Sequence, residues 1–192
     1  TDEGIGFKYG RTSIPKKIPL TKNFMRLAGY YLAEGSASFS SFRVNSGTLQ
    51  FTFNQHETDY IQDTTQLLKE VFQVDAALVS NHANHTIQIT VYSNILAYLF
   101  KTLFGDNATT KTVPSLFLEL PLEKQRELLV GLFRGDAHSR KENRSPEYIL
   151  NTTSRQLAYR VWMILTRFHA IPSFYISPKE NWYLRIIPRF VH

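Results

Sequence analysis

The sequence contains two nine-residue segments, 27–35 and 129–137, that share one pattern of residue types and lie 102 positions apart. The first reads Leu-Ala-Gly-Tyr-Tyr-Leu-Ala-Glu-Gly and the second reads Leu-Val-Gly-Leu-Phe-Arg-Gly-Asp-Ala. An internal repeat constrains a fold strongly, because each copy has to form the same local structure. We therefore expect a chain built from two related halves.

The small residues of each segment predict how the two segments pack. Gly29 with Ala33, and Gly131 with Gly135, are spaced by four and so share one face of a helix. Small residues on a helix face let two helix backbones approach closely. If the two helices pack on each other, the acid that closes each segment lies at the same end of the pair.

Those two acids, Glu34 and Asp136, predict a metal site. A carboxylate at a helix C-terminus is disfavoured by the helix dipole by roughly 0.3–1 kcal/mol, and two such carboxylates repel each other. A bound divalent cation removes both costs, and Mg²⁺ commonly takes one or two carboxylates together with substrate phosphate. Either acid alone would be an ordinary polar residue at a helix end, but the matched pair favours metal-assisted phosphodiester hydrolysis.

Hydrophobic periodicity gives the same order of elements around both segments: helix, two strands, helix, two strands. Thr21 is expected to cap the first helix, and a serine, Ser154, to cap the last. The expected helices are 21–35, 57–72, 95–104, 122–135 and 154–169, with a short turn opened by Pro114. The expected strands are 36–44, 49–55, 74–80, 86–92, 137–141, 148–152, 173–177 and 182–187.

Composition and charge narrow the class of protein. The chain has 192 residues, a net charge of +6 and no cysteine, which excludes disulfides, thiolate metal sites and cysteine nucleophiles. Residues 137–192 carry the whole positive surplus, which favours a polyanionic partner. The sequence has no run of apolar residues long enough for a membrane span, no signal-peptide pattern and no initiator Met, so we expect an intracellular chain, excised from a longer one or trimmed.

The paired segments resemble the motifs of the LAGLIDADG homing endonucleases, and the repeat order resembles that family's half-domain. The resemblance covers about residues 21–190, and it departs from the family pattern at Ala137, where glycine is usual. It implies an α+β fold of two pseudo-symmetric halves, each with an antiparallel four-stranded sheet, that form a saddle over DNA. The expected divisions are an N-terminal arm or linker at 1–20, a first half at 21–112 and a second half at 113–192.

The resemblance also implies the chemistry. Glu34 and Asp136 would each bind metal and serve the cleavage of one strand, joined by the carbonyl oxygens of Ala33 and Gly135. The expected cofactor is Mg²⁺, with Mn²⁺ as a substitute and Ca²⁺ binding without supporting cleavage. The product would be a double-strand break with short 3′ overhangs in a long, asymmetric site, made by a monomer wherever its target DNA resides.

The family often places a basic residue near the end of its fourth strand. The first half has no lysine there, so water relay by Thr52 or Asn54, or unequal cleavage of the two strands, remains open. In the second half Arg185 and Arg189 are the candidates.

Strand alternation leaves one face of each sheet polar and open, and we expect that face to read base edges while Lys and Arg hold phosphates. A merely solvated sheet face is the plain alternative. The candidates for contact with double-stranded DNA are Ser38, Ser40, Gln50, Thr52, Asn54, Gln88 and Thr90 in the first half. In the second half they are His138, Arg140, Lys141, Asn151, Ser173, Tyr175, Tyr183, Arg185 and Arg189.

Three other interpretations stay open. One is a cleavage-inactive DNA- or RNA-binding module on this fold, of the maturase or transcription-regulator type; the two retained acids favour the nuclease. A second is the endonuclease part of an intein with its splicing parts removed. A third, a purely structural interaction domain, leaves the matched acids unexplained.

Overall fold

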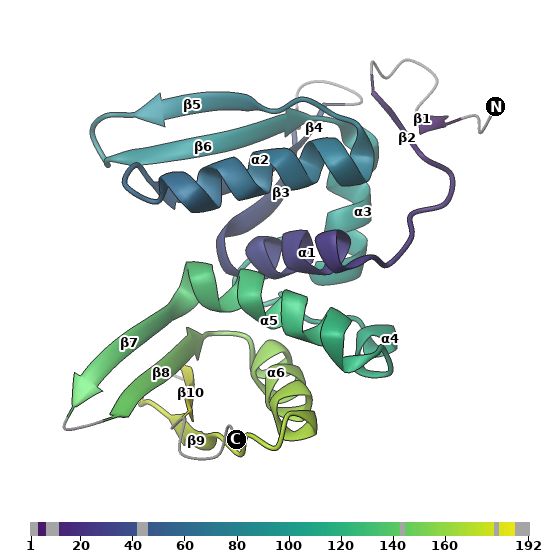
Figure 1. Cartoon of the computed structure of the whole chain (residues 1–192). Coiled ribbons are helices and arrows are strands. Elements are labelled where there is room, and N and C mark those ends of the chain that lie inside the picture. Colours follow the sequence, from purple (N-terminus) through teal and green to yellow (C-terminus); the bar gives the residue numbers. More distant parts are fainter. Residues whose placement is uncertain (1–3, 7–11, 42–45, 143–144, 179–180, 187–192) are drawn as a thin grey trace.

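A computed structural model describes residues 4–6, 12–41, 46–142, 145–178 and 181–186, with only the backbone of residues 137–147. Its two halves lie on either side of a central helix pair, α1 (Lys22–Glu34) and α5 (Leu122–Asp136) (Figure 1). The α+β class and the repeated element order expected from the sequence are both confirmed. The two copies of the repeated segment end the two central helices.

Each half holds one antiparallel four-stranded sheet. In the first half the strand order is β3-β4-β6-β5, and in the second it is β7-β8-β10-β9. The strands of the first sheet are β3 (Gly35–Phe39), β4 (Gly47–Asn54), β5 (Ala77–Asn81) and β6 (Thr86–Tyr92). Those of the second are β7 (Ala137–Glu142), β8 (Ser145–Thr152), β9 (Ser173–Ile176) and β10 (Trp182–Ile186).

Helices cover the apolar face of each sheet. The first half adds α2 (Thr58–Phe72) and α3 (Asn94–Phe104), and the second adds the short α4 (Ser115–Leu118) and α6 (Arg155–Arg167). Phe51 of β4 is fully buried and packs edge-on against Phe100 of α3 and Tyr31 of α1. Burial of these large rings supplies much of the apolar area that stabilises the first half.

The helix caps expected from the sequence are present. The hydroxyl of Thr21 accepts a hydrogen bond from the backbone N–H of Phe24, and Ser154 accepts one from Leu157. Each cap satisfies one of the amide groups that a helix start leaves unpaired, typically stabilising it by about 1 kcal/mol.

The backbones of α1 and α5 touch at two glycines. A Cβ atom added to Gly29 would stand 2.2 Å from the carbonyl oxygen of Leu128, and one added to Gly131 would stand 2.2 Å from that of Arg26. Side chains of any size would therefore push the helices apart. The close approach predicted from the spacing of small residues is confirmed, and it brings the two motif ends together.

A polar network ties the halves together beside this contact. Arg134 of α5 donates hydrogen bonds to the Tyr30 hydroxyl at 2.9 Å and to the Asp63 carboxylate at 3.0 Å. Arg26 of α1 pairs with the same Asp63 at 3.3 Å and with Glu127 of α5 at 3.5 Å. Burial raises the pKa of Tyr30 to about 12, so its hydroxyl stays protonated in this network at neutral pH.

The structure adds detail to two of the expected boundaries. The region 1–20, taken as an arm or linker, contains a two-stranded ribbon of β1 (Ile5–Gly6) and β2 (Ser13–Ile14), and Ile14 is buried in the core. The first expected strand, 36–44, ends earlier, at Phe39. No described helix is long and apolar enough to cross a membrane.

We predict that Gly131→Ala destabilises the protein by about 2 kcal/mol, because its methyl group would overlap backbone atoms of α1. A loss of stability would indicate the close backbone contact, since Gly→Ala inside an uncrowded helix instead stabilises a protein by roughly 0.5–1 kcal/mol. Urea unfolding of the two proteins measures the difference. Thr102→Ala, at an exposed position of α3, is the matched control and should change stability little. A Gly131→Ala protein as stable as the parent would contradict the backbone contact.

Candidate nuclease centre

The two motif acids close the two central helices side by side. Glu34 is the last residue of α1 and Asp136 the last of α5. The space around Gly135, next to Asp136, shows how close they are. A Cβ atom added to Gly135 would lie 3.4 Å from the Glu34 Oε1 and 2.4 Å from the Cβ of Ala33. The carboxylate of the first motif therefore lies against the last turn of the second.

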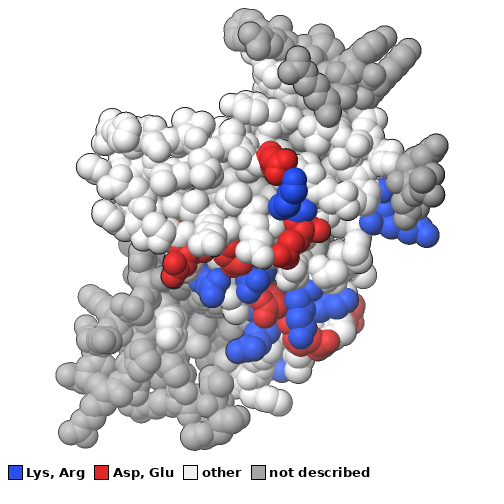
Figure 2. Space-filling view, turned by 45° about the horizontal axis from the view of Figure 1, so that its top comes forward, with Lys and Arg blue, Asp and Glu red and all other residues white. Residues whose placement is uncertain are grey.

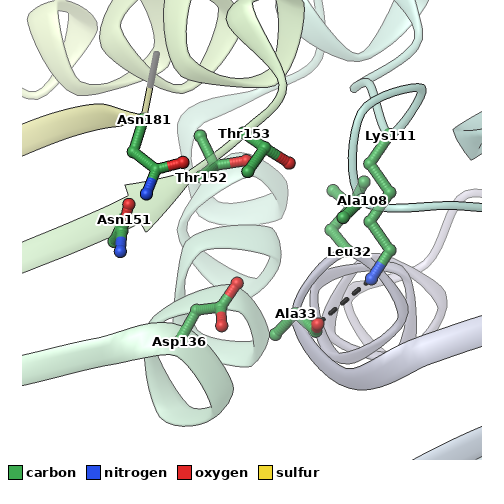
Figure 3. Close-up of a pocket in the computed structure, with 9 residues that line it drawn as sticks. All are labelled: Leu32, Ala33, Ala108, Lys111, Asp136, Asn151, Thr152, Thr153 and Asn181. Carbon is green, nitrogen blue, oxygen red and sulfur yellow. Dashed lines mark hydrogen bonds between the residues drawn. The ribbon is translucent and has the colours of Figure 1, made fainter. Parts of the chain in front are cut away.

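A buried lysine, Lys111, lies beside the two acids. It comes from the segment that connects α3 to α4, and its side chain is only 8% exposed. Its Nζ donates a hydrogen bond to the carbonyl oxygen of Ala33 at 3.1 Å, as Figure 3 shows. Its own carbonyl accepts one from the hydroxyl of Ser154, the cap of α6, at 2.6 Å. Lys111 thus contacts both halves of the molecule.

These groups line a small, open pocket of about 210 Å³. Asp136, Lys111 and Ala33 form one side of it, and polar residues of the second half form the other (Figure 3). The polar lining residues are Asn151, Thr152, Thr153 and Asn181. The pocket therefore offers one carboxylate, one ammonium group and several neutral donors and acceptors around a single space.

The surroundings of Glu34 disfavour its ionised form, as the sequence suggested. Burial raises the pKa of Glu34 to about 7, and the negative charges of Asp136 and Glu57 add to the rise, while Lys111 opposes it. Burial lowers the pKa of Lys111, and the two carboxylates counteract that shift. A cation near Glu34 would favour its ionised form.

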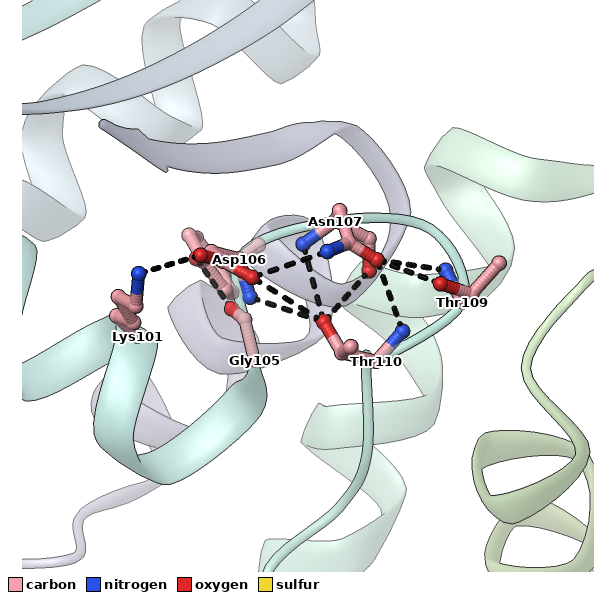
Figure 4. A network of polar contacts seen from close by, with 7 residues as sticks. Lys101, Gly105, Asp106, Asn107, Thr109 and Thr110 are labelled. Atoms are coloured by element: carbon pink, nitrogen blue, oxygen red, sulfur yellow. Dashed lines mark hydrogen bonds and ion pairs between the residues drawn. The ribbon is translucent and has the colours of Figure 1, made fainter. Parts of the chain in front are cut away.

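The compact loop that precedes Lys111 is held by its own polar contacts (Figure 4). The Asn107 side chain accepts hydrogen bonds from the backbone N–H groups of Thr109 and Thr110, both at 3.1 Å. Asp106 pairs with Lys101 at 2.6 Å, and the backbone N–H of Lys111 bonds to the Asn107 carbonyl at 3.0 Å. These contacts fix the path of the backbone one residue before the lysine.

The donor set fits a hard divalent cation only in part. Glu34 and Asp136 supply carboxylate oxygens, the ligands that Mg²⁺ prefers. Among the described residues no group of three or more His, Cys, Asp or Glu side chains could hold a metal. The Ala33 carbonyl already accepts from Lys111, whereas nothing in the structure tests the proposed role of the Gly135 carbonyl. The two carboxylates suit a Mg²⁺ ion that also takes water and phosphate ligands.

The first sheet brings most of the expected contact residues onto one face. In the strand register, Gln50 of β4 lies opposite Ser36 of β3 and Thr90 of β6. Thr52 of β4 lies opposite Gln88 of β6. The expected contact of Thr90 with DNA needs correction. Thr90 is on the open face of the sheet, but it is only 2% exposed because its neighbours cover it. Its hydroxyl accepts a hydrogen bond from the Gln50 amide at 3.5 Å. Ser38, Ser40 and Asn54 are exposed.

In the second sheet the register places the remaining candidates. Asn151 pairs with Tyr183, and Arg185 pairs with Ile149 and Ser173; Tyr175 and Tyr183 are adjacent, with ring centroids 5.7 Å apart. His138 and Arg140 of β7 lie opposite Ile149 and Glu147, on the same face. Lys141 pairs with Pro146 in the register, and its contact with DNA stays a prediction. Arg189 lies outside the described residues.

Comparison with known proteins identifies the fold. Residues 123–189 match the sequence model of the LAGLIDADG-like domain family. The structure superimposes on that of the homing endonuclease I-DmoI in complex with DNA and Mn, with a TM-score of 0.64, 12% identity and coverage of 88% of this chain and 90% of that one. This chain has the LAGLIDADG fold. The N-terminal LAGLIDADG domain of WhiA is similar as well, with a TM-score of 0.58, 12% identity and coverage of 88% and 79%.

Sequences similar to this chain lie within longer proteins. An uncharacterized protein of Methanocaldococcus jannaschii is 31% identical over 90% of this chain and 20% of its own length. The DNA polymerase II large subunit of Thermococcus kodakarensis is 31% identical over 89% and 9%, and a SufBD family protein of Mycobacterium tuberculosis is 29% identical over 80% and 18%. The chain thus spans at most about a fifth of these relatives.

The sequence analysis missed three residues near the acids: Lys111, Asn181 and Glu57. Lys111 stands in a connecting segment 77 positions after Glu34, and no local pattern sets it apart from other lysines. Glu57 precedes α2 and Asn181 precedes β10, so both read as ordinary loop residues. Only tertiary contacts between segments distant in the chain place them near the acids.

We predict that Glu34→Gln stabilises the metal-free protein, and more so as pH rises. Because the folded-state pKa of Glu34 is raised to about 7, the folded state binds its proton more tightly than the unfolded state does. The stability that the protonated carboxyl contributes is therefore present below the unfolded-state pKa of about 4.3 and is lost as pH rises through about 7.

Thermal unfolding in EDTA at several pH values measures this effect. Parent and variant should unfold at similar temperatures near about pH 5, and the variant should be the more stable one near about pH 8. Glu119→Gln, at an exposed position, is the control and should show no such divergence. A constant difference across the pH range would show that Glu34 does not carry the raised pKa.

Proposed function

We propose that this chain is a site-specific, metal-dependent DNA endonuclease of the homing type. It would cut both strands of a long, asymmetric DNA site and leave short 3′ overhangs. The observation that carries the proposal is the pairing of Glu34 and Asp136 at the ends of two helices whose backbones touch at Gly29 and Gly131. Two adjacent carboxylates repel each other and so lower the stability of the fold, but a bound cation would remove that repulsion.

In this proposal Glu34 and Asp136 hold Mg²⁺, or Mn²⁺ in its place, at the scissile phosphates. When bound, the cation would supply Lewis-acid chemistry for phosphodiester hydrolysis. Lys111 would supply fixed positive charge beside the reacting phosphate, because its Nζ is held between the acids and the Ala33 carbonyl. Asn151 and Asn181 would orient water or phosphate oxygens from the opposite side of the pocket.

The two sheets would supply specificity. Each has one face buried by helices and one polar face, and a β-ribbon fits the major groove of B-DNA, where all four base pairs can be distinguished. The unlike residues of the two polar faces match an asymmetric target better than a palindrome. We propose one chain per DNA site, with 21–112 and 113–192 as the two half-domains.

A DNA-binding module without cleavage is the second candidate. The similarity to a domain of WhiA favours it, because the LAGLIDADG fold is shared with a protein whose name does not indicate a nuclease. The presence of both acids, and of a buried lysine beside them, favours cleavage in this chain. An RNA-binding, maturase-type role has no separate support in the structure.

We further propose that the chain is part of a mobile element inserted in host proteins, of the intein type. The relatives support this origin, because similar segments occur in proteins as unlike as a DNA polymerase subunit and a SufBD family protein, of which they form only a small part. A mobile, target-specific cut would explain how one segment reached unrelated hosts.

The deciding experiment is cleavage of a randomised duplex library with Mg²⁺, followed by sequencing of the cut ends. A single long asymmetric motif with short 3′ overhangs is the expected result. Retention of specific duplexes without cuts would support the binding module instead. If the protein neither retains nor cuts DNA, both candidates are wrong.

With a target in hand, Glu34→Gln and Asp136→Asn should each slow cleavage by at least about a hundredfold, since each removes a carboxylate ligand of the proposed metal. Gel-shift binding in Ca²⁺ should be retained, and Glu119→Gln should behave as the parent. Normal cutting of both strands by either acid variant would refute the assigned chemistry.

Lys111→Met keeps a long side chain in the buried site while removing its charge. We predict that it lowers the cleavage rate by about a hundredfold and leaves Ca²⁺-dependent DNA binding within a few-fold of the parent. Lys22→Met, at the exposed first position of α1, is the matched control, because it removes the same charge without touching the loop that holds Lys111. Parent-like cleavage by Lys111→Met would show that the lysine only fills space.

A further inference from the structure

The first sheet carries no charge. None of the residues in β3, β4, β5 and β6 is Lys, Arg, Asp or Glu. On the face of the molecule that Figure 2 shows, the upper part has few Lys, Arg, Asp or Glu side chains, and these gather in a band across the middle. A surface that held DNA chiefly by phosphate attraction would need Lys or Arg there.

The polar face of this sheet instead holds amides, hydroxyls and exposed methyl groups. Gln88 of β6 lies between Thr52 of β4 and Val79 of β5 in the register. Val79 is 46% exposed, which is unusual for an aliphatic side chain on a polar sheet face. Gln50 is one diagonal step away from Gln88, next to Thr90, whose hydroxyl accepts from its amide.

This set of groups matches one kind of base pair. Gln makes a bidentate contact with the N6 and N7 of adenine, and methyl groups of Thr or an aliphatic side chain contact the C5-methyl of thymine. Guanine is most often read by Arg or Lys, which the first sheet lacks altogether. Fixed by the Thr90 hydroxyl, the Gln50 amide is partly oriented before any contact with DNA is made.

The second sheet has a different set. Arg185 of β10 and Arg140 of β7 are on its polar face, with Asn151 and His138. Arg185 is exposed and lies opposite Ser173 and Ile149, so its guanidinium group belongs to the open side of the sheet. Arginine is the side chain best suited to the O6 and N7 of guanine.

We infer that the two half-sites differ in base composition: the one under the first sheet is rich in A·T pairs, with adenines read by Gln50 and Gln88, and the one under the second contains guanine read by Arg185. This inference rests on the proposed function, because it requires double-stranded DNA across both sheets. The two polar faces begin beside the acids, since Ser36 is two residues after Glu34 and His138 is two after Asp136. The change of composition should therefore occur at the cut.

The test is selection from a randomised duplex library in Ca²⁺, so that binding is read without cleavage. One side of the selected motif should be dominated by A·T pairs, and the other should contain at least one strongly preferred guanine. Gln88→Arg should change an adenine preference to guanine at a position on the A·T side. Gln88→Ala should lower the adenine preference there about tenfold without creating a new one.

Gln62→Arg is the matched control, because it adds the same charge at an exposed position of α2, away from the sheet face. It should strengthen binding to all duplexes alike and leave the motif unchanged. Thermal unfolding of all three variants shows whether each is folded before its motif is compared with that of the parent.

The possible results separate this inference from the proposed function. A motif with guanine on both sides, or one in which Gln88→Arg alters only the other half or nothing at all, overturns the base assignment while the endonuclease stands. A protein that cuts DNA with no difference between half-sites overturns the base assignment as well. If no duplex is retained, both the inference and the proposed function are wrong.

Discussion

The contact between the backbones of α1 and α5 determines most of this structure. At Gly29 and Gly131 the two helices approach so closely that a single methyl group on either would overlap a carbonyl oxygen of the other. This approach sets the distance between the halves, aligns the ends of the helices and so brings Glu34 to the backbone of Gly135. Protein interiors are packed too densely to absorb even a small displacement, so a change at the glycines would reach the carboxylates.

The acids are placed where electrostatics disfavours them. Each stands at a helix C-terminus, Glu34 is partly buried, and each raises the cost of ionising the other. Lys111 offsets part of this cost from a loop that is itself held by Asn107 and Asp106. The arrangement costs stability, and in the proposed function a cation and a phosphate would offset that cost, a balance that is typical of catalytic centres.

The two halves are alike in backbone fold but differ in the side chains on the polar faces of their sheets. The two sheets share strand order and antiparallel pairing, yet the first has no charged residue in any strand and the second has arginines on its polar face. Lys111 likewise contacts Ala33 of the first motif and Ser154 of the second half, and so belongs to both. A fold made of two copies of one unit thereby presents two unlike surfaces, as the recognition of an asymmetric target requires.

The sequence by itself determined the repeat, the four-stranded sheets, the helix caps and the motif acids. These follow from local rules: Thr21 and Ser154 cap helices through contacts three residues away, and Leu49, Phe51 and Phe53 alternate with polar neighbours wherever the strand lies. The place of Lys111 in the site depended on contacts with residues 78 and 43 positions away, and the burial of Thr90 depended on the neighbours that strand pairing brings to it. Such features were decided only by the tertiary structure, because burial and pKa arise from neighbours that are distant in the chain.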